Sequence, residues 1–450
     1  MGLTFRGGVH VDESKNARKS KIELFPAPKF VSIPLSQHIG LPAKPLVRVG
    51  DIVDKGQMIA DNDDRDELSC PVHSSISGRV ISISVGQNLN GDYGYIKIEN
   101  DYADRLHISV QPFRKKISET TPDEIINFVR AAGIAGLGGE AFPTYAKIQS
   151  AKDKVSVLII NCAESEPHIT ANHRLMIENP EYIINGMKIL MKALGLRTGY
   201  IAVEDNKLDA VNILSEVASK SRMVQIKVLK TKYPQGDERQ IIYALTGKEL
   251  PSGKLPTDIG CVVFNAETCA AICNAFVFGI PLVERIVTVD GDCIITPKNL
   301  RVPFGTPISS LIEYCGIKRE PAKIIKGGPM MGRSVFDINE PVTKGTSAVL
   351  AFSERKQKKT QSCIHCGKCA DACPMSLLPS YLAMFAQKED MERCEKYDVF
   401  SCVECGCCAY ICPAGIPIVQ HISAAKVKIF KSRESDIGDN KIDSTEEDNS

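Results

Sequence analysis

Hydrophobic and polar positions along the chain follow three successive patterns. Between about residues 31 and 112, Val and Ile alternate with polar residues in short runs that Gly and Pro interrupt, as at 45–60 and 70–85. This alternation is typical of half-buried strands joined by tight turns. Between about 118 and 283, strand-like apolar runs alternate with helical periodicity, which predicts a parallel, Rossmann-like α/β sheet. After residue 355 we expect a short helical domain.

The α/β region contains the elements that a parallel sheet requires. A helix over 121–131 is expected to begin at Thr121 and Pro122, since Pro suits the first turn and acidic residues follow it. In open α/β sheets, ligands bind at the carboxyl ends of the strands. We expect strands at 155–167, 198–205 and 225–230, with further helices at about 180–194 and 207–220.

Polar side chains end two of these strands. Asn161, Glu164 and Glu166 follow the first strand, and Glu204 and Asp205 end the second. Taken alone, each acid could simply be a surface residue that is exposed to water where its strand ends. Two strands that end in acids beside a Gly-rich loop favour a binding site instead.

The Gly-rich loop spans 133–139 and includes Gly136, Gly138 and Gly139. Such a loop exposes backbone N–H groups and lets a phosphate or a flat ring approach closely, although many Gly-rich loops are only turns. No strand leads into this loop, so it is not the usual dinucleotide-binding fingerprint. A loop-rich segment at 233–272 is expected to close over a bound cofactor.

The clearest pattern is a cysteine motif that occurs twice near the end of the chain. CIHCGKCADACP and CVECGCCAYICP both read C-x2-C-x2-C-x3-C-P, which is typical of ferredoxins with two [4Fe-4S] clusters. In these ferredoxins the fourth Cys of each motif binds the other cluster. A pair of zinc ribbons would need neither the third Cys nor the Cys-Pro. The predicted ligands are Cys363, Cys366, Cys369 and Cys412 for the first cluster, and Cys402, Cys405, Cys408 and Cys373 for the second.

Composition limits the remaining possibilities. With 450 residues, 43% hydrophobic and 24% charged, the chain has the composition of a globular protein with about three domains. The net charge of +1 gives no electrostatic reason to expect binding to nucleic acid or to an anionic membrane. Iron–sulfur ligands among the 17 Cys require a reducing compartment. We find neither a signal peptide nor an apolar run of about 18 residues, so membrane association is expected through partner proteins.

Four segments of the middle region resemble, in the same order, the flavin- and NADH-binding subunit of respiratory complex I. They are 136–147, 161–168, 233–239 and 263–269. The resemblance implies that the glycine loop and Lys147 hold the FMN phosphate, and that Glu238 and Lys254 lie near NAD(H). Ala163 and the triplet at 237–239 depart from that family's pattern. The position of polar residues at strand ends and this resemblance together give the candidate cofactor-binding residues Gly136, Gly138, Gly139, Lys147, Asn161, Glu164, Glu166, Tyr233, Gly236, Asp237, Glu238, Lys254, Asn265 and Thr268.

Over nearly its whole length the chain resembles the RnfC family, which is part of the Rnf ion-translocating electron transport complex. The stretches FRGGVH, PLSQHIG, KTKYPQGDERQ, GGPMMG and PVTKGTS carry this resemblance. It implies a multidomain α+β fold. The expected boundaries are 1–30 for an N-terminal arm, 31–112 for a barrel-sandwich hybrid domain, 118–283 for a Rossmann-like FMN/NADH domain, 284–330 for a small β-grasp (SLBB) domain, 331–354 for a return strand and linker, 355–430 for an α-helical two-cluster ferredoxin-like domain, and 431–450 for a disordered acidic tail.

The barrel-sandwich domain is similar to lipoyl- and biotinyl-carrying domains. However, its linking segment at 61–69 lacks the Lys that would carry such a group. We therefore expect this domain to be structural or to serve as a docking surface.

A flavin and two clusters in one chain predict conversion between two-electron and one-electron transfer, because hydride carriers exchange electron pairs whereas a [4Fe-4S] cluster takes one electron. The resemblance implies an NAD:ferredoxin-type translocase subunit that requires no acid–base side chain. Its implied partners are integral membrane and ferredoxin-type iron–sulfur subunits, which couple electron flow to Na⁺ or H⁺ transport. It implies a peripheral position on the cytoplasmic face of the bacterial cell membrane.

Two other functions remain open. One is a non-enzymatic electron-transfer and assembly subunit with a vestigial flavin site, an alternative that Ala163 supports. The other is a soluble flavin/iron–sulfur cobalamin reductase, which shares these parts but carries its barrel-sandwich domain at the other end of the chain.

Overall fold

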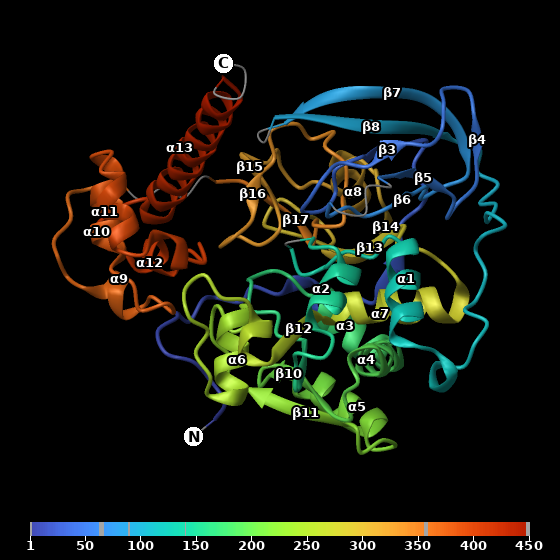
Figure 1. Ribbon diagram of the computed structural model, residues 1–450, viewed down its shortest axis with the longest axis horizontal. Coiled ribbons are helices and arrows are strands. Elements are labelled where there is room, and N and C mark those ends of the chain that lie inside the picture. The colour runs from blue at the N-terminus through green and yellow to red at the C-terminus, as the bar shows by residue number, and fades with distance from the viewer. Residues whose placement is uncertain (1, 63–66, 89–90, 140, 355–358, 447–450) are drawn as a thin grey trace.

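The computed structural model describes residues 2–62, 67–88, 91–139, 141–354 and 359–446. Figure 1 shows a body built of sheets and helices, with the C-terminal helices grouped beside it. Parts of the predictions above lie outside the described residues, namely residue 1 of the expected arm, 63–66 in the linking segment, 89–90 in the expected barrel-sandwich domain, residue 140 in the 136–147 segment, 355–358 in the expected ferredoxin-like domain and 447–450 in the expected tail.

The first part of the chain forms two small antiparallel sheets around one apolar core. Their strand orders are β2–β8–β7–β4 and β3–β5–β6. Ile96 and Ile98 on β8 are fully buried, because alternate residues of a strand point to the same face. The predicted barrel-sandwich architecture is thereby confirmed. The strands are β2 (Phe30–Pro34), β3 (Lys44–Pro45), β4 (Ile52–Val53), β5 (Met58–Asp61), β6 (Val72–His73), β7 (Gly78–Asn88) and β8 (Gly91–Asn100).

The middle part is a parallel sheet with the order β11–β10–β9–β12. Leu158 of β9 packs into the large core with Leu190 of α4, whereas Ile159 faces a second core with Ile241 of α6. Both faces are covered, which explains the continuous apolar runs of these strands. The strands are β9 (Val157–Asn161), β10 (Gly199–Glu204), β11 (Val224–Leu229) and β12 (Cys261–Asn265). The helices are α1 (Pro122–Ala131), α2 (Thr144–Ala151), α3 (Ala171–Glu178), α4 (Pro180–Leu194), α5 (Leu208–Ala218), α6 (Glu238–Thr246) and α7 (Ala266–Phe278), with short 3-10 turns at Ile117–Glu119 and Pro256–Ile259.

Local sequence explains where these helices begin. Thr121 and Glu124 form a reciprocal capping box at the start of α1, with Pro122 in its first turn. The side chain of Asn265 accepts the N–H of Glu267 at the start of α7. The predicted strands and helices of this region are therefore found close to their expected positions.

A six-stranded sheet with the order β1–β14–β13–β17–β15–β16 joins distant parts of the chain. The expected small β-grasp domain begins with β13 and β14, which are antiparallel and lie on either side of Gly291. The expected return strand, β17, lies in the same sheet parallel to β13. The elements are β13 (Glu284–Asp290), β14 (Lys298–Pro303), α8 (Ile308–Cys315), β15 (Lys323–Lys326), β16 (Arg333–Ser334) and β17 (Ala348–Phe352).

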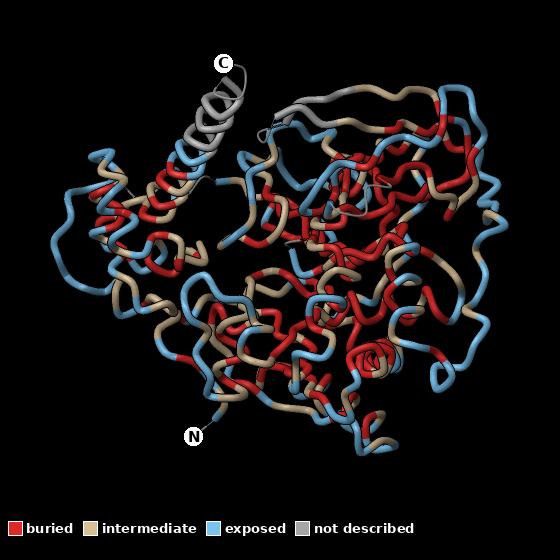
Figure 2. Tube along the Cα trace, in the orientation of Figure 1, coloured by how far each residue is buried: buried red, intermediate tan, exposed pale blue. Residues whose placement is uncertain are grey.

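The described part of the N-terminal arm, residues 1–30, is built into the other domains. Its strand β1 (Ile22–Leu24) pairs in parallel with β14, after a 3-10 turn at Asn16–Lys19. Figure 2 shows that buried residues concentrate in the sheets and in the helices that cover them. An arm was expected from sequence, but its pairing with a strand of the β-grasp sheet was not.

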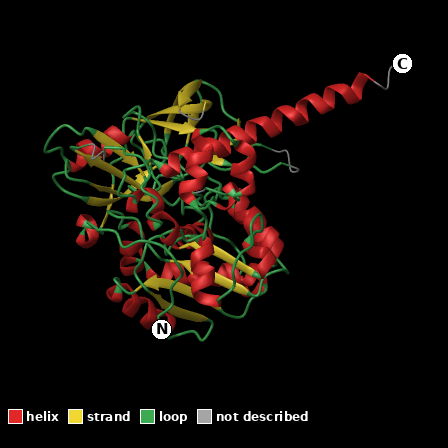
Figure 3. Cartoon of the chain, turned by 90° about the vertical axis from the view of Figure 1, so that its left-hand side faces the viewer, coloured by secondary structure: helices red, strands yellow, loops and turns green. Residues whose placement is uncertain are grey.

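The last part is helical and contains both cysteine motifs. Acidic composition predicts disorder from residue 431, whereas α13 continues to Glu446 and leads away from the body (Figure 3). A helix that has been nucleated by packing extends at small cost per residue, which explains the difference. Among the described residues, no helix is long and apolar enough to cross a membrane. The helices are α9 (Lys368–Asp371), α10 (Pro379–Gln387), α11 (Met391–Lys396), α12 (Cys407–Ile411) and α13 (Ile418–Glu446), with a 3-10 turn at Val399–Ser401.

Candidate functional site

The glycine loop lies between α1 and α2 and is supported from behind. A Cβ at Gly133 would lie 2.6 Å from the carbonyl oxygen of Pro71, so only glycine permits this close approach. The N–H of Leu137 donates to Oγ1 of Thr268 at 2.9 Å, which fixes the loop to α7. Gly139 has a φ of +115° and no atom within 4 Å of its Cβ position, so this part of the loop faces open space.

Polar groups on α2 and α6 border the same loop. Oγ1 of Thr144, at the start of α2, is buried and has no hydrogen-bond partner among the described residues. Nζ of Lys147, one turn further on, contacts Oε1 of Glu238 at 2.6 Å and lies over the ring of Phe264. A buried hydroxyl and a lysine beside an open glycine loop are groups that a phosphate would satisfy, so these residues fit an FMN phosphate.

Two asparagines end neighbouring strands of the parallel sheet. Asn161 of β9 and Asn265 of β12 are register partners. Nδ2 of Asn161 donates to the carbonyl oxygen of Gly236 at 2.7 Å, and the Cβ position of Gly138 lies 3.5 Å from Asn265. The structure therefore brings the glycine loop, both strand ends and the 233–236 loop together, as the sequence predicts for a flavin site.

Glu164 and Glu166 make contacts that support the site from outside. The carboxylate of Glu164 accepts the N–H groups of Asn172 and His173 at the start of α3. The carboxylate of Glu166 accepts the N–H groups of Met330 and Met331, and burial raises its pKa. Both acids satisfy backbone donors, which is a structural role that the resemblance does not imply.

Three further residues of the predicted site have different environments, namely Asp237, Lys254 and Tyr233. Asp237 caps α6 through the N–H groups of Arg239 and Gln240, and burial raises its pKa to about 6. Lys254 is exposed on a surface loop. Tyr233 is buried, and its hydroxyl donates to the carbonyl oxygen of Cys405 at 2.7 Å. Tyr233 therefore connects the candidate flavin site with a predicted cluster ligand.

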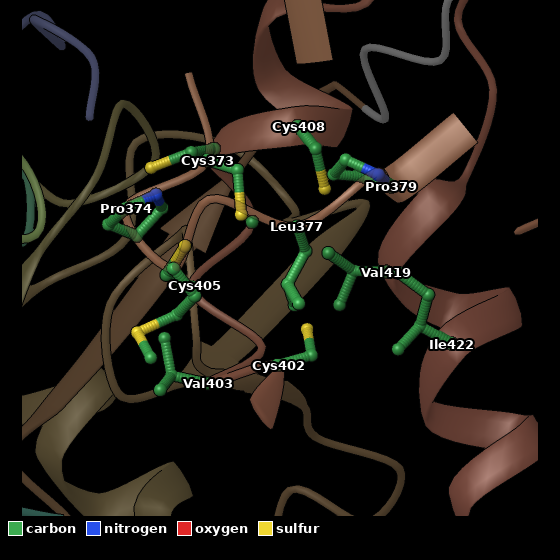
Figure 4. A pocket seen from close by; sticks show the side chains of 13 residues that line it. Cys373, Pro374, Leu377, Pro379, Cys402, Val403, Cys405, Cys408, Val419 and Ile422 are labelled. Carbon is green, nitrogen blue, oxygen red and sulfur yellow. The ribbon is translucent and has the colours of Figure 1, made fainter. Parts of the chain in front are cut away.

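The four cysteines predicted for the second cluster surround one pocket. Figure 4 shows Cys373, Cys402, Cys405 and Cys408 around it, with Leu377 among them. Three ligands come from the second motif and Cys373 from the first, as the cross-motif assignment requires. Burial raises the pKa of Cys402 to about 11 and also raises that of Cys408, so thiolates at this place need a cation such as iron. The residues fit a [4Fe-4S] cluster in these respects.

The two motifs fold alike. The N–H of His365 donates to Sγ of Cys363, and the N–H of Glu404 donates to Sγ of Cys402, both at 3.4 Å. The ligands of the first cluster lie nearer the surface, since Cys363 and Cys366 are exposed, Cys369 is half-buried and Cys412 is buried. No group of three or more His, Cys, Asp or Glu side chains in the described part of the chain is arranged to hold a metal ion. The cluster assignment therefore depends on spacing, the shared pocket and the repeated loop.

Two buried cations support the glycine loop and were not predicted from sequence. Arg285 pairs with Glu267 at 2.9 Å and donates to the carbonyl oxygen of Leu137 at 3.1 Å. Nζ of Lys344 donates to the carbonyl oxygens of Gly133 and Pro71, at 2.8 and 3.2 Å. Their contacts join residues far apart in sequence, so spacing within any one motif carries no signal for them.

Family models match the chain in the order of its domains. An RnfC barrel sandwich hybrid domain matches residues 3–103, a Nuo51 FMN-binding domain 129–274, and an SLBB domain 286–334. Two overlapping 4Fe-4S dicluster domain models match 362–416 and 337–378.

Three curated relatives cover almost all of the chain, and each is by name the C subunit of an ion-translocating oxidoreductase complex. The one from the proton-translocating ferredoxin:NAD(+) oxidoreductase complex of Clostridium ljungdahlii is 43% identical, over 95% of this chain and 94% of the relative. The one from the Na(+)-translocating ferredoxin:NAD(+) oxidoreductase complex of Acetobacterium woodii is 41% identical, over 96% and 98%. The one from the ion-translocating oxidoreductase complex of Rhodobacter capsulatus is 40% identical, over 95% and 84%.

A solved structure shares the fold at low identity. A chain of the NAD+-reducing [NiFe]-hydrogenase in the H2-reduced state superposes with a TM-score of 0.50 at 18% identity. The match covers 70% of this chain and 64% of that one.

Proposed function

Because the chain belongs to the RnfC family of ion-translocating oxidoreductase complexes, we propose that it exchanges electrons between NAD(H) and low-potential one-electron carriers. FMN and two [4Fe-4S] clusters are the cofactors of this proposal, in agreement with the matching domain models. The observation that carries it is the direct contact of the 233–240 segment, which comprises the loop at Tyr233 and the first turn of α6, with the second cluster pocket.

That contact has two hydrogen bonds. Oη of Tyr233 donates to the carbonyl oxygen of Cys405 at 2.7 Å, and Nε2 of Gln240 donates to Sδ of Met375 at 3.3 Å. The same loop reaches Asn161 through the carbonyl oxygen of Gly236. One short segment thus contacts both Asn161, at a strand end of the candidate flavin site, and the pocket lined by Cys405 and Met375.

The residues proposed to hold FMN form two groups, one that would bind its phosphate and one that would bind its ring. Gly136, Gly138 and Gly139 would present backbone to the phosphate, with Lys147 as its counter-charge. Asn161 and Asn265 would present side-chain amides to the ring. A bound flavin supplies exchange of electrons in pairs or singly, which neither NAD(H) nor an iron–sulfur cluster does alone.

The protein's own contribution is positioning. Thr268 fixes the glycine loop through the N–H of Leu137, and Glu267 with Arg285 fixes the same loop through buried contacts. These groups are in place before any cofactor binds, so little ordering is required at that step. The cysteines of the second cluster lie beside this site, whereas Cys363 and Cys366 are exposed where an external redox protein can approach.

We further propose that partner subunits supply the membrane anchor, the ion path and ferredoxin-type clusters. The relatives are named as parts of ion-translocating complexes, which supports this assignment. The coupling ion is Na⁺ in one relative's name and H⁺ in another's. The cytoplasmic face of the bacterial membrane is the proposed location, since NAD(H) and reduced iron–sulfur ligands are found there.

Anaerobic purification of the full chain tests the function. We expect two clusters and one FMN per chain, by iron, sulfide and flavin assay, together with NADH-dependent reduction of an artificial one-electron dye. Lys147→Met should lower flavin content and dye reduction but leave iron content unchanged, and Lys152→Met is its matched control. Clusters without flavin would contradict the proposal in favour of an electron-transfer and assembly subunit. Activity that depends on a corrinoid would contradict it in favour of a cobalamin reductase.

A further inference from the structure

The FRGGVH stretch of the N-terminal arm lies between the candidate flavin site and the second cluster pocket. The N–H of Gly8 donates to the carbonyl oxygen of Ala372 at 2.9 Å. Val9 and Tyr233 exchange two backbone hydrogen bonds, of 2.8 and 2.9 Å. One dipeptide of the arm therefore joins the first cysteine motif to the loop that contacts Cys405.

Close approach at this place requires glycine. A Cβ on Gly7 would lie 2.5 Å from the carbonyl oxygen of Cys373 and 2.8 Å from its carbonyl carbon, and the φ of Gly7 is +68°. A Cβ on Gly8 would lie 2.6 Å from the carbonyl oxygen of Tyr233. Any larger residue at Gly7 must move the backbone of Cys373, because the contact is with backbone and not with a flexible side chain.

The contact is also buried. Val9, Tyr233, Ala372, Cys405 and Cys407 form a small apolar cluster of their own, which is separate from the larger cores. Four segments contribute to it, namely the arm, the 233–236 loop and each of the two cysteine motifs. Packing of this kind transmits a displacement of one member to the others.

The arm is fixed at a second point, on the segment that follows β9. Nζ of Lys15 donates to the carbonyl oxygens of Glu164, Glu166 and Ile169, at 2.9, 2.9 and 2.7 Å. These three carbonyls belong to the segment that follows Asn161. The arm thus contacts the loop after β9 and the loop at Tyr233, as well as the motif of Cys373.

The geometry points to the N-terminal arm as the element that sets the distance between the flavin site and the second cluster, with Gly7 and Gly8 as positioning residues. This inference rests on the proposed electron transfer. The arm supplies no electron carrier. It fixes Cys373 and Tyr233 relative to each other, so that transfer between the two sites is fast only while the arm is seated.

The test compares Gly7→Ala with Gly195→Ala in the full chain carrying FMN and clusters. Gly195 has a φ of +69° and no atom within 4 Å of its Cβ position, so its variant carries the same backbone strain without the contact. NADH is mixed with each protein anaerobically, and flavin and cluster absorbance are followed separately. In Gly7→Ala we expect unchanged flavin reduction and a several-fold slower cluster reduction, because the rate of electron tunnelling falls exponentially as the distance between the two sites increases. Gly195→Ala should match the unsubstituted protein in both phases.

Hydrogen exchange in the cofactor-free chain gives a second readout. The amides of Gly8, Val9 and Tyr233 should exchange faster in Gly7→Ala and at unchanged rates in Gly195→Ala. Equal cluster reduction rates and equal exchange in the two variants would overturn the inference. Failure of NADH to reduce the flavin of the unsubstituted protein would overturn the proposed function instead, and exchange would still decide whether the arm fixes the two loops.

A side-chain variant covers the case in which Gly7→Ala does not accumulate. Phe5→Ala removes a buried ring next to Gly8 and Lys232 without backbone strain. Phe5→Ala should also slow cluster reduction. Phe25→Ala is the control, because Phe25 lies further along the arm and packs against Tyr314, and it should leave the rate unchanged. Equal rates in these two variants would also overturn the inference.

Discussion

Oη of Tyr233 lies 2.7 Å from the carbonyl oxygen of Cys405, and both residues are buried. This hydrogen bond directly joins a residue implied in flavin binding to a residue implied in cluster binding. Burial, with the nearby carboxylate of Glu166, raises the pKa of Tyr233, so the hydroxyl keeps its proton and remains a donor throughout the physiological range.

Tyr233→Phe should destabilise the chain by about 1–3 kcal/mol, because a buried carbonyl loses its donor. Thermal unfolding of the holo-protein measures this, with Tyr102→Phe at an exposed position as control. Equal unfolding midpoints for the two variants would show that the hydrogen bond contributes nothing.

Removal of Cys373 distinguishes cross-motif from within-motif ligation. In a Cys363→Ala/Cys366→Ala background, which lacks the first cluster, about four iron atoms per chain should remain. Adding Cys373→Ser should then reduce iron to nearly zero, because Cys373 belongs to the second cluster. Retention of about four iron atoms would assign Cys373 to the first cluster instead. Cys394→Ser, at a buried position outside both ligand sets, is the control.

Lys147→Met should weaken FMN binding by roughly 10- to 100-fold, which corresponds to the loss of about 1.5–3 kcal/mol for a charge-assisted hydrogen bond. Glu238→Gln should leave FMN affinity equal or higher, because it removes the carboxylate that pairs with Lys147. Titration of the flavin-free chain, followed by flavin fluorescence, measures both. Weaker FMN binding in Glu238→Gln would instead place the carboxylate among the flavin contacts.

Arg285→Met should destabilise the chain by about 3–5 kcal/mol, because the carboxylate of Glu267 would remain buried without its partner. The double variant with Glu267→Leu should lose less than Arg285→Met alone, which denaturant unfolding can show. Arg319→Met is the control, since Arg319 lies 4.0 Å from Asp292 at an exposed position and its pair should contribute about 0–1 kcal/mol.

His73 makes stability depend on pH. Burial, with nearby Lys344, lowers the pKa of His73 to about 3. Below about pH 6.5 the imidazole of His73 takes up a proton in the unfolded chain but not in the folded chain. The free energy of unfolding should therefore fall as pH decreases, by about 1.4 kcal/mol per pH unit. His73→Gln should lack this loss between pH 6.5 and 5, measured by denaturant unfolding of the cofactor-free chain. A wild-type curve parallel to that of His73→Gln would contradict the expectation.

Hydrophobic periodicity and residue spacing within short segments were sufficient to predict most of the strands and helices. Alternation predicts strands within 45–60 and 70–85, where most of β5 and the start of β7 lie, and the apolar run into Asn161 predicts a buried parallel strand with its ligand end at that residue. The repeated cysteine spacing predicts that Cys373 joins Cys402, Cys405 and Cys408, and one pocket contains all four. In each case the signal lies within a short segment, where period and spacing are set by backbone geometry.

Contacts between distant segments could not be predicted in this way. Glu164 follows a strand as ligand-binding acids do, yet it caps α3, because the direction of its side chain depends on where that helix packs. Arg285, Lys344 and Lys15 contact the site from other domains, and nothing in their own surroundings in sequence distinguishes them from surface cations. Their roles depend on tertiary packing, which periodicity does not encode.

The parallel pairing of Ile22 with Asn299 has a consequence for biosynthesis. At about 5–20 residues per second, a ribosome reaches Asn299 roughly 15–55 s after Ile22. During that interval the start of the polypeptide has no partner strand and must stay free of wrong ones. The two cysteine motifs follow Asn299 in the sequence, so the first segment gains its partner strand before synthesis of the cluster-binding cysteines is complete.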